Sequence, residues 1–283
     1  MIQDYKYLKT IDGRELHLEI SEKGKKSWLI VTHGIGEHLE RHDYIGELFG
    51  NHFNILKYDL RGHGRSQGSK RGYVDDFSLF YDDLSEVISF LKNSYKMDEY
   101  CLFGHSMGAL ITAGFMQTKV NKNFYPKAVY LNAPPAGFPG ILGEIVNVMP
   151  QNVISKLTEL PVSLKIGGLV DLRYLSHDPR VREDYVNDEF NVLKPHSKLI
   201  LELVKASKDV FSKPIRIECP AFCSYGSEDR IVNVGHLENY LNMIDKSFKV
   251  QAFDGAYHEI HNEIEKYRLP YFEFLKESLL SIL

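Results

Sequence analysis

The chain has 283 residues, with 34 lysines and arginines against 38 aspartates and glutamates, giving a formal net charge of −4. Hydrophobic residues make up 43% and charged residues 25%, as in ordinary globular proteins, which excludes a disordered or collagen-like chain. Nucleic acid is not expected as a partner because the chain has no basic surplus. No apolar stretch reaches the ~18 residues of a membrane-spanning helix.

The predicted elements alternate between strands and helices after an initial hairpin. Residues 5–10 and 15–20 are extended in pattern, and Asp12-Gly13 between them favours a tight turn. Further strands are expected at 28–32, 53–58, 100–103, 127–131, 221–225 and 248–253. Helices are expected near 44–49, at 77–91, at 107–117 and from about residue 264. This alternation predicts an α/β fold with a mostly parallel sheet and helices on both faces.

One long segment interrupts the alternation. No strand pattern is present between residues 134 and 214, whereas apolar residues recur at helical spacing in 141–149 and 198–204. We interpret this segment as a helical insertion over the strand ends, where ligands bind in such sheets. The expected organisation is therefore a core formed by 1–133 and 215–283, with 134–214 as a cap.

The most informative motif is Gly104-His-Ser-Met-Gly108, a G-x-S-x-G sequence between an expected strand and an expected helix. In that context Ser106 lies on a sharp turn that exposes its hydroxyl and leaves room only for small flanking residues. The helix N-terminus also favours a developing negative charge. We expect Ser106 to be a nucleophile; the alternative is an incidental serine in a glycine-rich turn.

A serine nucleophile needs a histidine as its base. In a fold of this kind the chain order is serine, acid, histidine. His258 follows the expected strand 248–253 in a loop and is the favoured base, with His261 as the nearest alternative. The two do not form an H-E-x-x-H zinc motif, because their spacing is too short.

The base in turn needs a carboxylate that orients its ring and stabilises the imidazolium. Asp229 lies just beyond the expected strand 221–225 and is the candidate, while Glu228 and Asp254 compete with it. Loop length and alternation do not separate Glu228 from Asp229.

The tetrahedral intermediate of such chemistry needs two N–H donors. One is expected from Met107, and the other from the loop 33–38, His-Gly-Ile-Gly-Glu-His. The histidines of this region, His33, His38 and His42, are not expected to bind a metal, because no cysteine or carboxylate set completes a site. The turn 59–66, which lacks the G-K-[ST] of a phosphate loop, is expected to be structural.

Cysteine usage bears on the compartment. The three cysteines, Cys101, Cys219 and Cys223, are few and odd in number, and the N-terminus lacks the apolar run of a signal peptide. We therefore expect a cytoplasmic protein with reduced thiols, in which Cys101 and Cys223 are small core residues.

Taken together, the motifs resemble the α/β-hydrolase superfamily, and within it the monoacylglycerol lipase and lysophospholipase-like group. The matching segments are 33–38, 58–66, 104–108, 176–179, 225–229 and 257–258, in the order of the family. The resemblance implies Ser106 as nucleophile, Asp229 as acid, His258 as base, and Ile35 and Met107 as oxyanion-hole positions. It also implies a cap that covers the site and contacts membranes through apolar helices.

The expected function is therefore a serine hydrolase of single-chain lipid esters, above all monoacylglycerols, working through an acyl-enzyme without metal or organic cofactor. A lysophospholipase or a short-chain carboxylesterase is the alternative within this class. A peptidase would need an acidic residue aimed at the substrate amine, and a non-catalytic binding protein would ordinarily lack a member of the triad. The apolar runs of the cap fit either peripheral contact with a membrane or ordinary helix core.

Overall fold

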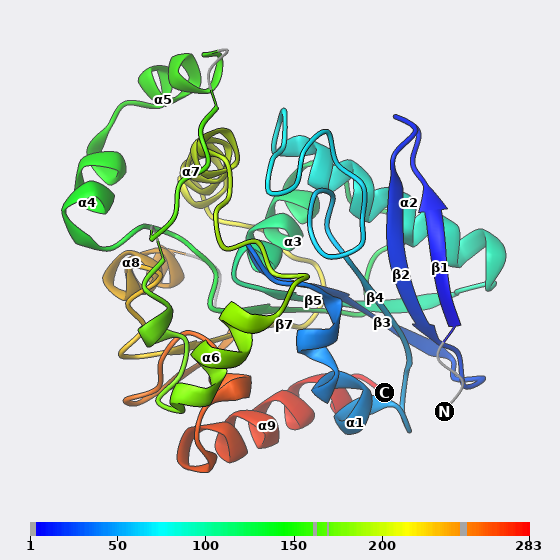
Figure 1. Cartoon of the computed structure of the whole chain (residues 1–283). Helices are drawn as coiled ribbons and strands as arrows, with labels where there is room; N and C mark the ends of the chain where they lie inside the picture. Colours follow the sequence, from blue (N-terminus) through cyan, green and yellow to red (C-terminus); the bar gives the residue numbers. More distant parts are fainter. Residues whose placement is uncertain (1–3, 161–162, 169, 244–247) are drawn as a thin grey trace.

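The computed structural model describes residues 4–160, 163–168, 170–243 and 248–283. In this part of the chain, eight strands form one sheet in the order β1-β2-β4-β3-β5-β6-β7-β8 (Figure 1). The β1–β2 and β2–β4 pairs are antiparallel, and all later pairs are parallel. The predicted mostly parallel sheet is therefore confirmed, with the hairpin at one edge.

The strand bounds are β1 Asp4–Lys9, β2 Glu15–Ser21, β3 Ser27–Thr32, β4 Asn54–Tyr58, β5 Glu99–His105, β6 Ala128–Asn132, β7 Ala221–Gly226 and β8 Phe248–Phe253. The α-helices are α1 Tyr44–Phe49, α2 Ser78–Ser94, α3 Met107–Thr118, α4 Gly140–Val148, α5 Gln151–Thr158, α6 Pro179–Asn187, α7 Ser197–Phe211, α8 Val234–Met243 and α9 Glu265–Leu280. Short 3₁₀ helices are η1 Leu39–His42, η2 Leu172–Tyr174 and η3 Ile260–Asn262.

The central strands are buried on both faces, which explains their continuous apolar sequences. Every residue of β3 and of β4 is buried, as expected for strands covered by helices on both sides. On one face, residues of α2 and α3 such as Phe80 and Leu110 form a single core with α7. On the other face, Phe49 of α1 and Tyr271 of α9 form a second core. Cys101 and Cys223 are buried, as predicted.

The segment between β6 and β7 carries α4, α5, α6 and α7, and no residue of it belongs to a strand of the described sheet. Helix α7 packs on the core, where Gln117 of α3 donates to the carbonyl of Val210 at 2.9 Å. Figure 1 shows α4 and α5 farther out, beyond α7. Helices α5, α6 and α8 were not predicted from the sequence. None of the described helices has the length and apolar character needed to cross a membrane.

Candidate active site

Ser106 lies between the end of β5 and the start of α3, on the sharp turn that the motif predicts. Its φ of 52° and ψ of −118° place a non-glycine residue in a strained region of backbone space. The neighbours must be small, because a Cβ on Gly104 would overlap the carbonyl of Gly108. A Cβ on Gly108 would in turn overlap the carbonyl of Thr32 in β3. The turn therefore presses directly against the sheet, with Ser106 at its apex.

Three side chains that lie far apart in the sequence form one hydrogen-bond chain at this apex. The Nε2 atom of His258 lies 2.9 Å from Ser106 Oγ, and its Nδ1 atom lies 2.6 Å from Asp229 Oδ2. The other carboxylate oxygen of Asp229 accepts from the backbone N–H groups of Ile231 and Val232 at 2.8 and 3.1 Å. With Asp229 accepting at Nδ1, the neutral ring carries its proton there, which leaves Nε2 free to accept the serine proton.

The environment of His258 shifts its pKa. Burial by itself lowers the pKa of the ring, but the Asp229 carboxylate outweighs this, aided by Glu259 and Glu37, so the pKa of His258 is raised above 6.5. Ser106, His258 and Asp229 are each at most 6% exposed. The Asp229 charge therefore acts on the His258 ring with little screening by solvent.

The competing residues are placed elsewhere. Glu228 is exposed and lies 3.7 Å from Arg230, and Asp254 accepts from the Ser227 hydroxyl at 3.2 Å. His261 lies in η3, where its ring stacks with Tyr44. Among the alternatives left open by the sequence, Asp229 and His258 are thus the pair that meets Ser106.

The loop after β3 is held in one conformation by its own side chains. The backbone N–H of Leu60 donates to His33 Nε2 at 2.9 Å, so the proton of the neutral ring sits on Nδ1, which donates to the Gly34 carbonyl at 2.7 Å. Burial, reinforced by His63, lowers the pKa of His33 to about 3, so the ring stays neutral. The Gly34 N–H donates to Glu37.

This bonding fixes the direction of the next peptide group. In a trans peptide the C=O and N–H point in opposite directions, so the Ile35 N–H points away from His33. Ile35 also lines the cavity above Ser106. Met107 is the first residue of α3, and its N–H is one of those without an acceptor inside the helix. The side chain of Met107 itself is buried in the core.

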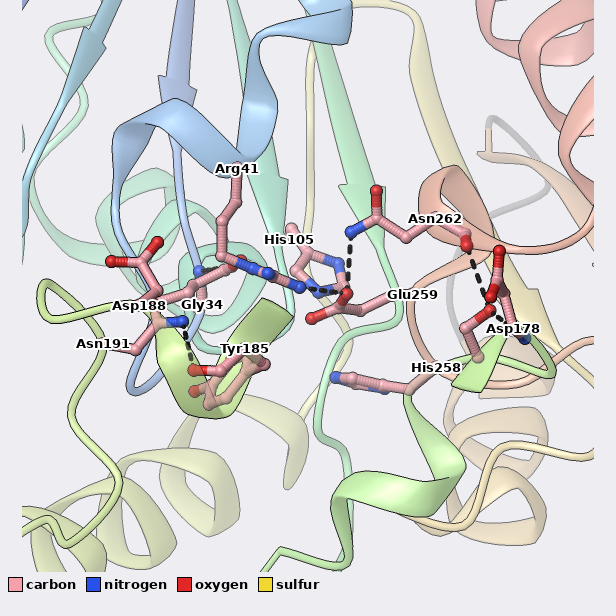
Figure 2. A network of polar contacts seen from close by, with 12 residues as sticks. Gly34, Arg41, His105, Asp178, Tyr185, Asp188, Asn191, His258, Glu259 and Asn262 are labelled. Atoms are coloured by element: carbon pink, nitrogen blue, oxygen red, sulfur yellow. Dashed lines mark hydrogen bonds and ion pairs between the residues drawn. The ribbon is translucent and has the colours of Figure 1, made fainter. Parts of the chain in front are cut away.

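A network of charged side chains, which was not predicted from the sequence, borders the site. Arg41 donates through Nη2 to Glu259 and through Nε to Glu37, the latter at 3.3 Å. Figure 2 shows the Glu259 carboxylate between Arg41 and Asn262, near the His258 ring. Both Arg41 and Asn262 donate hydrogen bonds to this carboxylate. The guanidinium of Arg41 also lies 4.8 Å from the centre of the Tyr185 ring. The one sequence feature that pointed to this network was the glutamate at position 259, directly after His258.

A cavity of about 40 Å³ lies above Ser106. Its wall includes the polar side chains of Glu37, Glu259 and Tyr185. The rest of the wall is mostly apolar and comes largely from the segment between β6 and β7, through Val170, Leu172 and Leu175, with Ile231 added from the core. Within the described residues, no group of three or more His, Cys, Asp or Glu side chains has a geometry that could hold a metal ion.

Known proteins resemble this chain over most of its length. It is 25% identical to the monoglyceride lipase of Homo sapiens over 275 residues, which cover 93% of this chain and 86% of the relative. It is 24% identical to a monoglyceride lipase homolog of Monkeypox virus over 255 residues, which cover 85% of this chain and 84% of the relative.

Two solved structures share the fold. The monoacylglycerol lipase of Paleococcus ferrophilus superposes with a TM-score of 0.78 at 22% identity, covering 100% of both chains. A soluble variant of monoglyceride lipase from Saccharomyces cerevisiae, in complex with a substrate analog, has a TM-score of 0.81 at 20% identity, covering 100% of this chain and 96% of the other. The α/β-hydrolase fold is thereby confirmed. Because the model of the serine aminopeptidase family S33 also matches residues 23–265, the chain belongs to that family of hydrolases.

Proposed function

We propose that the protein is a serine hydrolase that cleaves carboxylic esters of single-chain lipids, with monoacylglycerols as the preferred substrates. The observation that carries the proposal is the continuous hydrogen-bond chain from Asp229 through His258 to Ser106. It ends on a serine held in strained backbone at a helix N-terminus. This arrangement supplies a nucleophile, a base and an orienting acid at one point.

The reaction proceeds in two halves. Ser106 Oγ attacks the ester carbonyl carbon while its proton passes to His258 Nε2, and the tetrahedral intermediate then collapses as the same proton moves to the leaving alcohol oxygen. This leaves an acyl group on Ser106. A water molecule next attacks the acyl carbon, giving its proton to Nε2, and collapse returns that proton to Ser106 as the carboxylic acid leaves.

The negative oxygen of each intermediate is stabilised by the N–H groups of Ile35 and Met107. The first is oriented by the bonds that His33 and Glu37 make to Gly34, and the second lies at the positive end of α3. Donors that are fixed before the reaction cost no reorganisation when charge develops, and each contributes about 10²–10³ in kcat.

The mixed polar and apolar wall of the cavity favours an ester with a polar alcohol and an apolar acyl chain. Glu37, Glu259 and Tyr185 offer acceptors and donors to hydroxyl groups, while the side chains from the cap offer apolar contact. The names of the relatives, monoglyceride lipases, support the same substrate class. A "Probable lysophospholipase L2" of Haemophilus influenzae is 26% identical over 129 residues, which keeps a lysophospholipase as the second candidate.

The charge pattern disfavours peptide substrates with a free N-terminus, despite the name of the family. A free amine would have to be met by an unpaired carboxylate near Ser106. The carboxylates of the cavity wall, Glu37 and Glu259, are both bonded to Arg41, so neither is the unpaired carboxylate that an amine would need.

We further propose that residues 134–214 act as a cap that contacts lipid surfaces. Exposed apolar side chains gather on its outer part: Ile145, Val148, Val153, Leu160 and Leu164. Ligand pockets commonly reach about 300–1,000 Å³, whereas the cavity here is about 40 Å³. A long acyl chain therefore requires the cap residues Val170, Leu172 and Leu175 to move outward.

Hydrolysis of a matched substrate panel tests the proposal. Long-chain 1-monoacylglycerol, lysophosphatidylcholine, p-nitrophenyl acetate and an aminoacyl-naphthylamide are compared at equal enzyme, with Ser106→Ala as control. We expect the highest kcat/KM for the monoacylglycerol and no activity in the variant. Preference for lysophosphatidylcholine would favour the second candidate, and cleavage of the acetate alone would indicate a short-chain carboxylesterase. Cleavage of the naphthylamide alone would overturn the assignment to esters.

A further inference from the structure

We propose that Glu263 is a positioning residue. It joins the cap to the loop carrying His258 and keeps the His258 ring within hydrogen-bond distance of Ser106. This inference rests on the proposed function, in which His258 is the base. Glu263 follows η3 and, within the described part of the chain, forms no hydrogen bond or ion pair with Ser106 or with the ring of His258. Its side chain has no exposed surface, and its carboxylate is hydrogen-bonded to Ser176, His177, Tyr257 and Ile264.

Donors from two segments converge on this one carboxylate. From the His258 loop, the backbone N–H of Tyr257 donates to Oε1 at 2.9 Å. From the cap, His177 reaches Oε1 through Nδ1 at 2.7 Å and Oε2 through its backbone N–H at 3.0 Å. The Ser176 hydroxyl lies 3.3 Å from Oε2, and the Ile264 N–H donates to it at 3.1 Å. Glu263 thus fixes the peptide group that joins Ala256 to Tyr257, one residue before His258.

The cap segment bound by Glu263 also meets the loop through its backbone. The N–H of His258 donates to the Tyr174 carbonyl at 3.3 Å, and the N–H of Glu259 donates to the Leu175 carbonyl at 2.8 Å. The His177 and Tyr257 rings stack with their centres 3.7 Å apart. Figure 2 shows Asn262 and Asp178 side by side, where Ser176 donates to the Asn262 carbonyl at 3.0 Å.

These contacts tie the base to the wall of the substrate cavity. Leu172 and Leu175 line the cavity and belong to the same cap segment, residues 172–177, that Glu263 binds through Ser176 and His177. The backbone N–H groups of both His258 and Glu259 depend on that segment. A displaced cap would therefore loosen His258 unless the Glu263 carboxylate kept Tyr257 in place. Since a misplacement of about 1 Å can cost about 10²-fold in rate, the link affects turnover of every ester.

The chemistry of the contacts requires a carboxylate. Both oxygens accept from N–H groups, so an amide at this position would point an NH₂ donor at other donors. Glu263→Gln therefore loses part of the network without a change in volume. The matched control is Glu202→Gln, since Glu202 is also buried and also joins the cap to the core, accepting from the Phe77 N–H at 3.3 Å. It lies in α7, away from His258.

The experiment measures kcat and KM on p-nitrophenyl butyrate and on a long-chain monoacylglycerol, with thermal unfolding midpoints for each variant. For Glu263→Gln we expect kcat to fall about 10–100-fold by the same factor on both esters, with KM changed less than about threefold. Labelling of Ser106 by a fluorophosphonate should slow by a similar factor. Glu202→Gln should lower the midpoint but leave kcat within about twofold of the wild type.

His177→Ala removes the side-chain donor that the cap gives to Glu263, at a partly exposed position. This variant is used in place of Glu263→Gln if the latter does not fold. It should lower kcat about threefold or more in the same pattern. The inference is overturned if both variants lower only the unfolding midpoint while kcat stays at the wild-type value. It is also overturned if only the long-chain ester is affected, because that pattern belongs to the cavity wall. If Ser106→Ala retains activity, the proposed function itself fails, whatever Glu263→Gln does.

Discussion

At the scale of single residues, the behaviour of the site depends on the charges around the His258 ring. Asp229 bonds its Nδ1 atom, while Glu259 and Glu37 lie close enough to raise its pKa further. Arg41 contacts both glutamates and offsets part of their charge. The position after a strand favoured His258 but did not separate Asp229 from Glu228, and only the family resemblance favoured Asp229. Arg41 was not predicted, since its partner Glu259 is 218 residues away.

The raised pKa predicts the pH dependence of turnover. If His258 is the base, as proposed, it is active only when unprotonated, so kcat/KM should rise with pH through a midpoint above 6.5. In Glu259→Gln a charge that raises the pKa is removed, and the midpoint should move to lower pH. Measuring kcat/KM from pH 5 to 9 checks both, with Glu202→Gln as the variant whose midpoint should not move. A midpoint that shifts upward in Glu259→Gln would contradict the assigned environment.

The choice of acid gives a second prediction at this scale. Asp229→Asn should lower kcat by about 10⁴-fold, because an amide stabilises the wrong tautomer of the imidazole. Glu228→Gln and Asp254→Asn, which keep the Asp229–His258 bond, should stay within about threefold of the wild type. Steady-state kinetics of the three variants on one ester decides between them. A larger loss in Glu228→Gln than in Asp229→Asn would reverse the assignment.

At the scale of elements, the close contact between β3 and α3 fixes the turn that carries Ser106. Gly108→Ala would push a methyl group into the Thr32 and His33 carbonyls. We expect about 1–3 kcal/mol of destabilisation, the usual cost of overpacking. The control is Gly46→Ala in α1, where a Cβ meets nothing within 4 Å, and which should stabilise by about 0.5–1 kcal/mol. Denaturant unfolding of both measures this. Equal stability for Gly108→Ala and the wild type would contradict the described packing.

The sequence predicted the buried elements better than the surface helices. Strands β3, β5 and β7 have apolar centres because they are buried along almost their whole length between covering helices, and α2 buries a regular stripe. By contrast, α6 buries one residue, Tyr185, and α8 buries two, Leu237 and Tyr240. One or two buried side chains leave no periodic pattern to detect. These helices are set by tertiary contacts, such as the cation–π contact of Arg41 with Tyr185.

The same limit applies to the site. Ser106 was predictable because the turn itself demands glycines at fixed offsets. The contacts of Glu263 were not, since they bring residues 176 and 177 of the cap to residue 257 of the core. Nothing in the local sequence around Glu263 distinguishes a buried acceptor from an exposed glutamate.

At the scale of the whole molecule, the proposed lipid-contacting surface of the cap is distinct from the cavity above Ser106. The side chains of Val148 and Leu164 are 80% and 66% exposed. They lie outside the set that lines the cavity. Burial of apolar side chains in a membrane interface would favour binding in proportion to their area.

The double variant Val148→Glu, Leu164→Glu tests this surface. It should bind phosphatidylcholine vesicles less, by co-sedimentation, while its kcat on a water-soluble short ester stays unchanged. The control is Ile11→Glu, which replaces a side chain 94% exposed in the β1–β2 turn, on the side of the molecule away from α4 and α5 in Figure 1. Equal loss of vesicle binding in both would show that the cap has no special role.

Covalent trapping shows whether Ser106 is a nucleophile activated by His258. The protein is treated with a fluorophosphonate and analysed by intact mass and peptide mapping, beside Ser106→Ala and His258→Ala. We expect one equivalent of label on Ser106, none in Ser106→Ala, and labelling of His258→Ala slowed by at least about 10²-fold. Label on another residue, or equal labelling of the wild type and His258→Ala, would contradict it.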